Sequence, residues 1–259
     1  MLIDSHCHLT SGKLAGQVEP ILLAARQAGV GLCVSAASDV ADSLAALDLA
    51  RRHAEVFCSA GVHPHEAEKT DERYLQQLEE IIVAGGDRCV AVGEIGLDYH
   101  YDFSPRDVQR RVFLGQLELA ARLGKPIIVH TREASEDSLG MLKEFSGRVR
   151  GVIHSFTGDA AEVRRFLDQG WYIGFSGIVT FKNSQPVREA AQLVPNDRLL
   201  VETDAPYLSP EPVRKLHPNT PANVAHVARC LAEVRRVSPQ AIADQTAANA
   251  TGLFKLHLA

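Results

Sequence analysis

Four histidines of this chain stand where runs of apolar residues end. The first run reads LIDSHCHL and carries His6 and His8, two residues apart. Further along, PIIVH ends in His130 and GVIH ends in His154. Imidazole nitrogens are common ligands of Zn²⁺ and of other transition-metal ions. A packed core gains nothing from this repeated placement, so it predicts a metal site.

Two carboxylates occupy equivalent places, since VAVGE ends in Glu94 and LLVETD ends in Asp204. A catalytic zinc ion usually takes three protein ligands, so six residues of ligand type are better explained by two ions. The economical assignment gives one ion His6, His8 and Asp204 and the other His130 and His154, with Glu94 bridging them.

The predicted ions are divalent: imidazole and carboxylate ligands suit Zn, Mn, Fe or Ni, and the lack of a thiolate argues against a structural zinc site. We take Mg, Mn and Zn as the candidates. Two such ions can hold the attacking and leaving oxygens of a phosphoryl transfer and activate a water molecule. Asp204 could also accept the proton of that water, whether or not it touches a metal. We therefore take Asp204 and Glu94 as the candidate catalytic residues.

Eight strand-like runs alternate with amphipathic helical stretches along the chain. The expected strands are Leu2–His6, Leu32–Ala36, Val56–Gly61, Val90–Gly93, Ile127–His130, Val152–His154, Trp171–Gly174 and Leu199–Glu202. The expected helices cover residues 17–29, 39–54, 71–84, 106–123, 135–146, 159–169, 185–194, 221–236 and 239–255. This order predicts an α/β fold, a single-domain (β/α)₈ TIM barrel over residues 1–259, whose active site lies where the strands end.

The composition argues against several classes of protein. The formal net charge is −5, whereas proteins that coat nucleic acid usually carry a basic stripe. No apolar run is long enough for a transmembrane helix, and the N-terminus lacks the basic and apolar regions of a signal peptide. Five cysteines without a CxxC pair are expected to be free thiols, with Cys7 in the core. These features predict a cytoplasmic protein without membrane contact.

Three residues near strand ends could contact a substrate phosphate. His63 ends the third run in GVHPHE, and Arg132 follows His130 by two residues. Lys182 lies in TFKN after the seventh run. A guanidinium can grip phosphate with two hydrogen bonds, but Arg132 could equally form a salt bridge at the rim. Lys182 could be an ordinary surface charge.

Other polar and aromatic residues leave two interpretations open. Asp4 and Glu202 lie one layer below the candidate ligands, where they could orient a ligand imidazole or pair with a polar group of the core. Tyr99, Tyr101 and Phe103 follow Glu94 and could stack on a nucleobase or pack within their own loop.

Taken together, the motifs resemble those of the TatD family of metal-dependent hydrolases, within the amidohydrolase superfamily. The matching blocks are DSHCHL, GVHPHE, VGEIGLDYHYD, GKPIIVHTREA, IHSFTG, GFSGIVTFKN and VETDAPYLSP. The resemblance implies a (β/α)₈ barrel, a dinuclear divalent metal centre and a deoxyribonuclease activity. It also implies the metal ligands His6, His8, Glu94, His130, His154 and Asp204.

One loop departs from the family pattern, which usually contains a basic stretch followed by Asn-Glu-Pro. Here residues 210–221 read PEPVRKLHPNTP, so Thr220 stands in the place of the glutamate. We expect this change to affect substrate preference and to leave the metal site intact.

Two functions remain for such a site. The first is a phosphodiesterase that removes nucleotides from the 3′ end of DNA, with single-stranded DNA or strand ends as substrate. The second is a hydrolase of a carboxylic ester or amide bond, on a small molecule or an aminoacyl-tRNA. Neither function requires an obligate protein partner.

Overall fold

The described residues, which are 1–257 of this computed structural model, form eight parallel strands and nine α-helices. The strands are β1 (Leu2–Cys7), β2 (Val30–Ser35), β3 (Val56–Ala60), β4 (Cys89–Asp98), β5 (Ile127–Arg132), β6 (Gly151–Ile153), β7 (Tyr172–Phe175) and β8 (Leu199–Val201). The helices are α1 (Val18–Gln27), α2 (Val40–Arg52), α3 (Tyr74–Gly85), α4 (Arg106–Leu123), α5 (Ser135–Glu144), α6 (Ala160–Asp168), α7 (Gln185–Leu193), α8 (Val224–Arg235) and α9 (Pro239–Phe254). Short 3₁₀ turns are η1 (Gly12–Leu14), η2 (Pro64–Lys69), η3 (Gly177–Thr180), η4 (Asn196–Arg198) and η5 (Pro221–Asn223).

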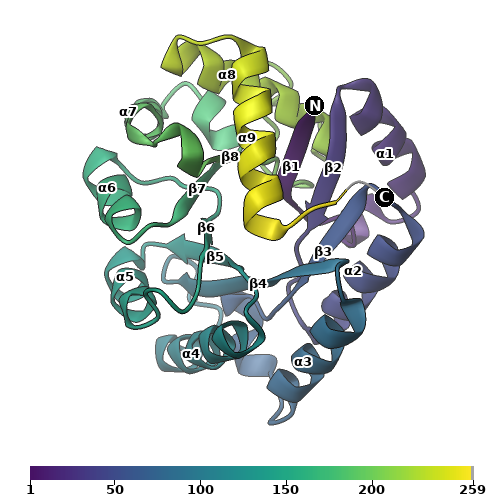
Figure 1. The fold of residues 1–259 in the computed structure, drawn as a ribbon, viewed down its shortest axis with the longest axis vertical. Coiled ribbons are helices and arrows are strands. Elements are labelled where there is room, and N and C mark those ends of the chain that lie inside the picture. The colour runs from purple at the N-terminus through teal and green to yellow at the C-terminus, as the bar shows by residue number, and fades with distance from the viewer. Residues whose placement is uncertain (258–259) are drawn as a thin grey trace.

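The strands pair in chain order from β1 to β8, and the helices surround them (Figure 1). The ring is completed between β1 and the segment that follows β8. There the Asp204 amide donates to the His6 carbonyl at 2.9 Å, and the His8 amide donates to the Ala205 carbonyl at 2.6 Å. The expected (β/α)₈ barrel is confirmed, and its closure brings Asp204 beside the two histidines of β1.

Apolar strands are buried on both faces, as parallel strands in a barrel should be. One cluster lies inside the barrel and includes Val34, Phe57, Ile128 and Leu200. Phe254 of α9 belongs to the same cluster, and α9 lies across the centre of the barrel in Figure 1. This end is therefore closed by apolar packing, which leaves the opposite end for chemistry.

Strand β4 is longer than the sequence pattern predicts. We expected Val90–Gly93, whereas the strand continues to Asp98, so Glu94 lies within it. Its pairing with β5 shifts between Val92 and Ile95 and then resumes. Gly96 has φ +139°, and a Cβ there would lie 1.9 Å from the His130 carbonyl oxygen. Glycine, which has no Cβ, permits this close approach of the two strands.

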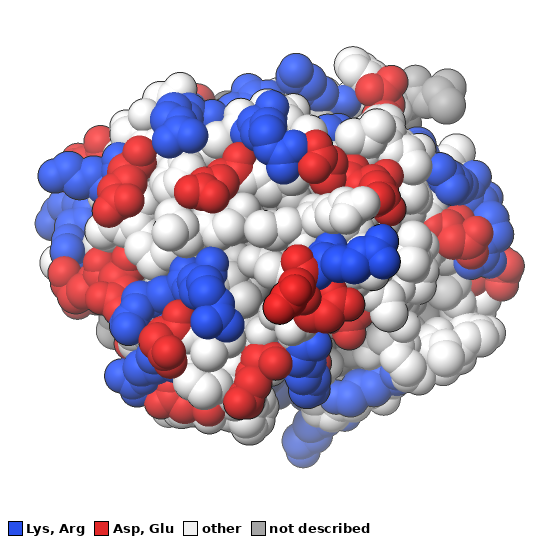
Figure 2. Space-filling model, turned by 90° about the horizontal axis from the view of Figure 1, so that it is seen from below, with Lys and Arg blue, Asp and Glu red and all other residues white. Residues whose placement is uncertain are grey.

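The surface carries both signs of charge. On the face shown in Figure 2, lysine and arginine side chains lie among aspartates and glutamates, with no continuous basic band. None of the helices within residues 1–257 has the length and apolar character needed to cross a bilayer.

Candidate metal centre

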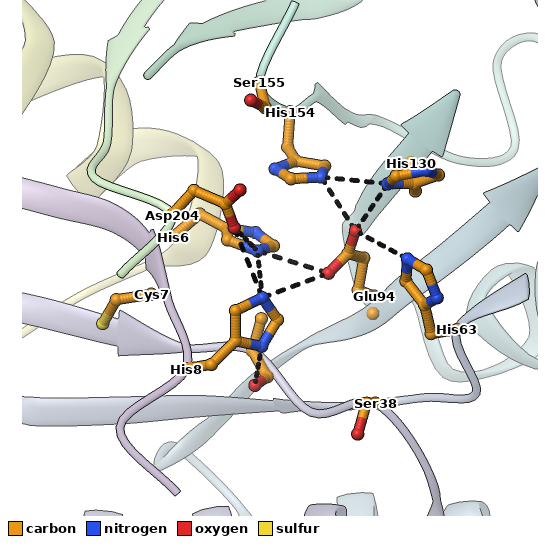
Figure 3. Close-up of polar contacts among 12 residues, drawn as sticks. His6, Cys7, His8, Ser38, His63, Glu94, His130, His154, Ser155 and Asp204 are labelled. Atoms are coloured by element: carbon orange, nitrogen blue, oxygen red, sulfur yellow. Dashed lines mark hydrogen bonds and ion pairs between the residues drawn. The ribbon is translucent and has the colours of Figure 1, made fainter. Parts of the chain in front are cut away.

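Glu94 lies at the centre of the barrel mouth, surrounded by imidazoles (Figure 3). Its side chain is 3% exposed. The Oε2 atom lies 3.3 Å from His6 Nε2 and 3.5 Å from His8 Nε2. This oxygen therefore faces the two histidines that come from the end of β1.

The other oxygen of Glu94 faces a different set of histidines. The Oε1 atom lies 2.8 Å from His154 Nε2 and 2.9 Å from His130 Nδ1. His63 Nε2 is 3.4 Å away on the same side. The carboxylate thus lies between two groups of imidazoles, one facing each of its oxygens.

Asp204 lies beside His6 and His8, because it follows β8 at the point where the barrel closes against β1. Its Oδ1 atom lies 3.6 Å from His6 Nε2 and 3.4 Å from His8 Nε2. The residue has φ +56°, a left-handed conformation that is uncommon outside glycine, asparagine and aspartate. The predicted ligands form two sets that could hold metal ions, His6–His8–Asp204 and His6–Glu94–His154. A third set, Glu94 and His130 with His63, includes a residue that the sequence suggested as a substrate contact.

Two of the imidazoles are oriented by acceptors behind them. His8 Nδ1 lies 3.1 Å from the Ala36 carbonyl oxygen, and His154 Nδ1 lies 3.2 Å from Glu202 Oε1. Because a carbonyl or carboxylate oxygen only accepts, each Nδ1 carries the proton. The Nε2 lone pair of each neutral ring then points toward the cluster. Metal-binding histidines are commonly oriented in this way.

His130 is oriented by Asp98, a residue that the sequence pattern did not single out. His130 Nε2 donates to Asp98 Oδ2 at 3.0 Å, so its Nδ1 lone pair faces Glu94. Asp98 is fully buried, which opposes its ionisation, but hydrogen bonds from His130, His65 and the Tyr101 amide hold its pKa below the usual value. The only signal in the sequence was an acid four residues after Glu94.

The donor set fits a divalent cation. The lone pairs of His8, His130 and His154 converge with two carboxylates in a buried space. His6 Nδ1 is buried without a hydrogen-bond partner, and His6 Nε2 lies 3.1 Å from His8 Nε2. Lone pairs and carboxylate oxygens packed this closely repel one another unless a cation or proton lies between them.

The electrostatics of the ligand groups agree with that requirement. Burial raises the cost of charge on Glu94, but the His154, His63 and His6 imidazoles hold its pKa well below the usual value. Burial lowers the pKa of His8, but the hydrogen bond with Asp204 outweighs this effect together with nearby carboxylate charges and raises the pKa to about 8. Without metal, protons on the imidazoles thus balance the carboxylates.

His63 differs from the other imidazoles in its proton position. Its Nδ1 atom accepts a hydrogen bond from the His65 amide at 3.1 Å. Burial lowers the pKa of His63 to about 4, so the ring is neutral and Nε2 carries the proton. The Nε2–H group points toward Glu94 Oε1 and suits a donor to an anion better than a metal ligand.

A cavity of about 1140 Å³ opens above this centre. His63 and Arg132 line it, as predicted for substrate contacts, whereas the exposed Lys182 is not among its lining residues. The arginine ion pairs of residues 1–257 do not include Arg132, so the salt bridge considered for it is not formed. Its guanidinium lies over the Tyr101 ring, 4.8 Å from the centroid.

The two deeper carboxylates have different partners. Glu202 Oε1 accepts from the Ser155 amide at 2.5 Å as well as from His154, so it orients a ligand imidazole. Asp4 instead accepts from the Thr203 amide at 2.8 Å and from the Thr203 hydroxyl at 2.5 Å. Asp4 therefore fastens β1 to the end of β8, which is the core pairing considered for it.

The loop that departs from the family pattern packs against the segment that carries Asp204. Within the described part of the chain, residues 210–221 do not line the cavity. Asn219 is buried and donates to the carbonyls of Thr203 and Tyr207 at 3.1 and 2.7 Å. It thereby positions the segment 203–208, through which the loop could influence Tyr207 at the rim.

Replacement of Glu202 by glutamine is expected to weaken metal binding by about 10- to 100-fold, because the proton position and orientation of His154 would no longer be fixed. Titration of metal-depleted protein with Zn²⁺ would measure this change. Glu189→Gln, on an exposed carboxylate of α7, is the matched control. Equal zinc affinities of the two variants would contradict the role of Glu202.

The barrel and the cluster of imidazoles and carboxylates at its mouth define a metal-dependent hydrolase. Residues 3–255 match the family described as "TatD related DNase". The chain is 36% identical to the uncharacterized metal-dependent hydrolase YabD of Bacillus subtilis, covering 99% of this chain and 100% of that protein. It is 37% identical to the 3′-5′ ssDNA/RNA exonuclease TatD of Edwardsiella piscicida, covering 98% and 100% respectively.

The crystal structure of the TatD homolog YJJV from Escherichia coli superposes with a TM-score of 0.93, at 33% identity over 99% of this chain and 98% of that one. The chain belongs to the TatD family.

Proposed function

We propose that this protein is a 3′-5′ exonuclease that shortens single-stranded DNA ends with the help of two divalent metal ions. The observation that carries the proposal is the position of Glu94, whose two oxygens face separate groups of histidines. The relative from Edwardsiella piscicida named as a 3′-5′ ssDNA/RNA exonuclease supports the choice of substrate.

In this proposal His6, His8 and Asp204 would hold one ion and His130 and His154 the other, with Glu94 available to both. Two divalent ions bound there would supply Lewis-acid chemistry, which stabilises charge on phosphate oxygens and lowers the pKa of a water molecule. Mg²⁺, Mn²⁺ and Zn²⁺ are the candidates for this donor set.

The protein side chains would then bind the phosphate and move a proton. Asp204 is 14% exposed in its side chain and lines the cavity, so it can accept the proton of the attacking water. The Nε2–H of His63 and the guanidinium of Arg132 would donate to phosphate oxygens. Lys182 is a weaker candidate for a phosphate contact, because it does not line the cavity and would have to reach into it from outside.

A strand end is a better substrate than a continuous duplex for this site. The ligand cluster lies below a single cavity at the end of the barrel, where one terminal nucleotide can enter. The formal net charge of −5 does not favour broad contact with the phosphates of a duplex. The geometry therefore favours contacts with one or a few phosphates.

The test uses 5′-labelled single-stranded DNA and the purified protein with each candidate metal. We expect stepwise shortening from the 3′ end, and no cleavage of a circular single strand of the same composition. Cleavage of the circle would overturn the exonuclease proposal. If both DNAs stay intact while an aminoacyl ester is hydrolysed, the alternative ester or amide hydrolase is correct.

A further inference from the structure

Two aromatic side chains lie exposed at the rim of the cavity. Tyr101 is 47% exposed and Phe103 is 64% exposed. Their rings are stacked, with centroids 5.2 Å apart and planes inclined by 18°. Aromatic side chains gain free energy when they are buried, so exposed ones forgo that stabilisation. Two adjacent exposed aromatic rings at the edge of a cavity therefore point to a ligand-binding surface.

The pair belongs to the same cavity as the candidate metal ligands. The edge of His65 meets the rings of Tyr101 and Phe103 at centroid distances of 5.4 and 4.8 Å. The Arg132 guanidinium lies over the Tyr101 ring. Arg132 itself follows the candidate ligand His130 by two residues in the sequence. The aromatic surface and the ligand cluster are thus neighbouring parts of one space.

The pair is held in place by the same carboxylate that orients His130. Asp98 Oδ1 accepts from the Tyr101 amide at 2.8 Å, and Asp98 Oδ2 receives His65 Nε2 at 2.9 Å. Because Asp98 is buried, these contacts fix the start of the loop and the imidazole behind the rings. A preorganised surface loses less conformational freedom when a ligand binds.

Tyr99 shows the contrasting case of packing within the loop. Its hydroxyl lies 2.6 Å from Asp137 Oδ2, and Arg106 covers its ring at 4.3 Å. The interpretation of loop packing therefore applies to Tyr99. It does not account for Tyr101 and Phe103, which stay 47% and 64% exposed despite their contacts with His65 and, for Tyr101, with Arg132.

We propose that Tyr101 and Phe103 form a stacking platform for the nucleobase of the terminal nucleotide. The proposal rests on the nuclease function above and names the substrate part that this surface recognises. A phosphate at the metal centre would place its attached nucleoside in the cavity, where the aromatic pair and the Arg132 guanidinium offer π-faces. Every base has a π-face, so the platform would tolerate any sequence.

The test compares the binding of 2′-deoxyadenosine 5′-monophosphate with that of 2-deoxyribose 5-phosphate, which lacks the base. Isothermal titration calorimetry with Mg²⁺ present measures both affinities without any hydrolysis of DNA. For the unmodified protein we expect the nucleotide to bind about 5- to 150-fold more tightly, the range that one stacked base provides. Equal affinities would overturn the platform.

Variants of Phe103 sharpen the comparison. Phe103→Ala is expected to lose most of the preference for the nucleotide without changing the affinity for the sugar phosphate. Phe103→Trp should retain the preference because it keeps an aromatic face. Val83→Ala, on an equally exposed apolar side chain of α3, is the control for nonspecific effects. A preference unchanged in Phe103→Ala and Tyr101→Ala would also overturn the platform.

These outcomes separate the two proposals. Nucleotide preference without shortening of DNA would keep the platform and reject the exonuclease. Shortening of DNA at the same rate with a terminal abasic sugar as with a base would keep the exonuclease and reject the platform.

Discussion

A protein carrying Glu94→Gln is expected to bind fewer metal ions and to lose hydrolysis by about 10³-fold or more, since the electrostatic stabilisation of the reaction depends on them. Each of the two Glu94 carboxylate oxygens faces a different pair of histidines. Oε1 faces His130 and His154, whereas Oε2 faces His6 and His8. Glutamine removes the negative charge and presents an NH₂ group to one set of lone pairs.

Elemental analysis of the purified variant gives the metal content, and single-turnover hydrolysis gives the rate. Glu133→Gln is the matched control, since Glu133 lines the same cavity but is 65% exposed and pairs with His100. The control should keep its metal and its rate. A Glu94→Gln protein that still holds two ions would contradict the shared-ligand assignment.

The candidate metal ligands were accessible to sequence analysis because each depends on local rules. His6 and His8 share a face through the alternation of a strand, and the strand ends of a parallel barrel meet at one mouth. The observed cluster brings them beside Glu94, His130 and His154, as that reasoning expects. Cys7 is fully buried and points away from the cluster, also as expected (Figure 3).

Contacts between distant segments were not accessible in the same way. Asp98 reaches His130 only because β4 continues past Gly93 and aligns Gly96 with His130 across the register shift. The proton position of His63 depends on the backbone of the turn that begins at Pro64. Lys182 follows η3, a turn that the sequence pattern did not predict, and it remains exposed. Each case depends on a register or a turn that local patterns leave open.

Asp204→Asn is expected to lower kcat by about 10²- to 10⁴-fold, the contribution typical of a general base. Its contacts with His6 and His8 are both made through Oδ1. An asparagine can keep a carbonyl oxygen in that position, yet its amide has no basic oxygen to accept a proton from water.

The metal content of Asp204→Asn and its response to added metal separate the two roles of this residue. We expect the variant to retain more metal than Glu94→Gln, because Asp204 belongs to one of the candidate ligand groups and Glu94 to two. If Asp204 acted only as a ligand, an excess of metal would restore kcat, since filling the site would then be sufficient. A rate that stays low at saturating metal identifies Asp204 as the proton acceptor, and full recovery contradicts it.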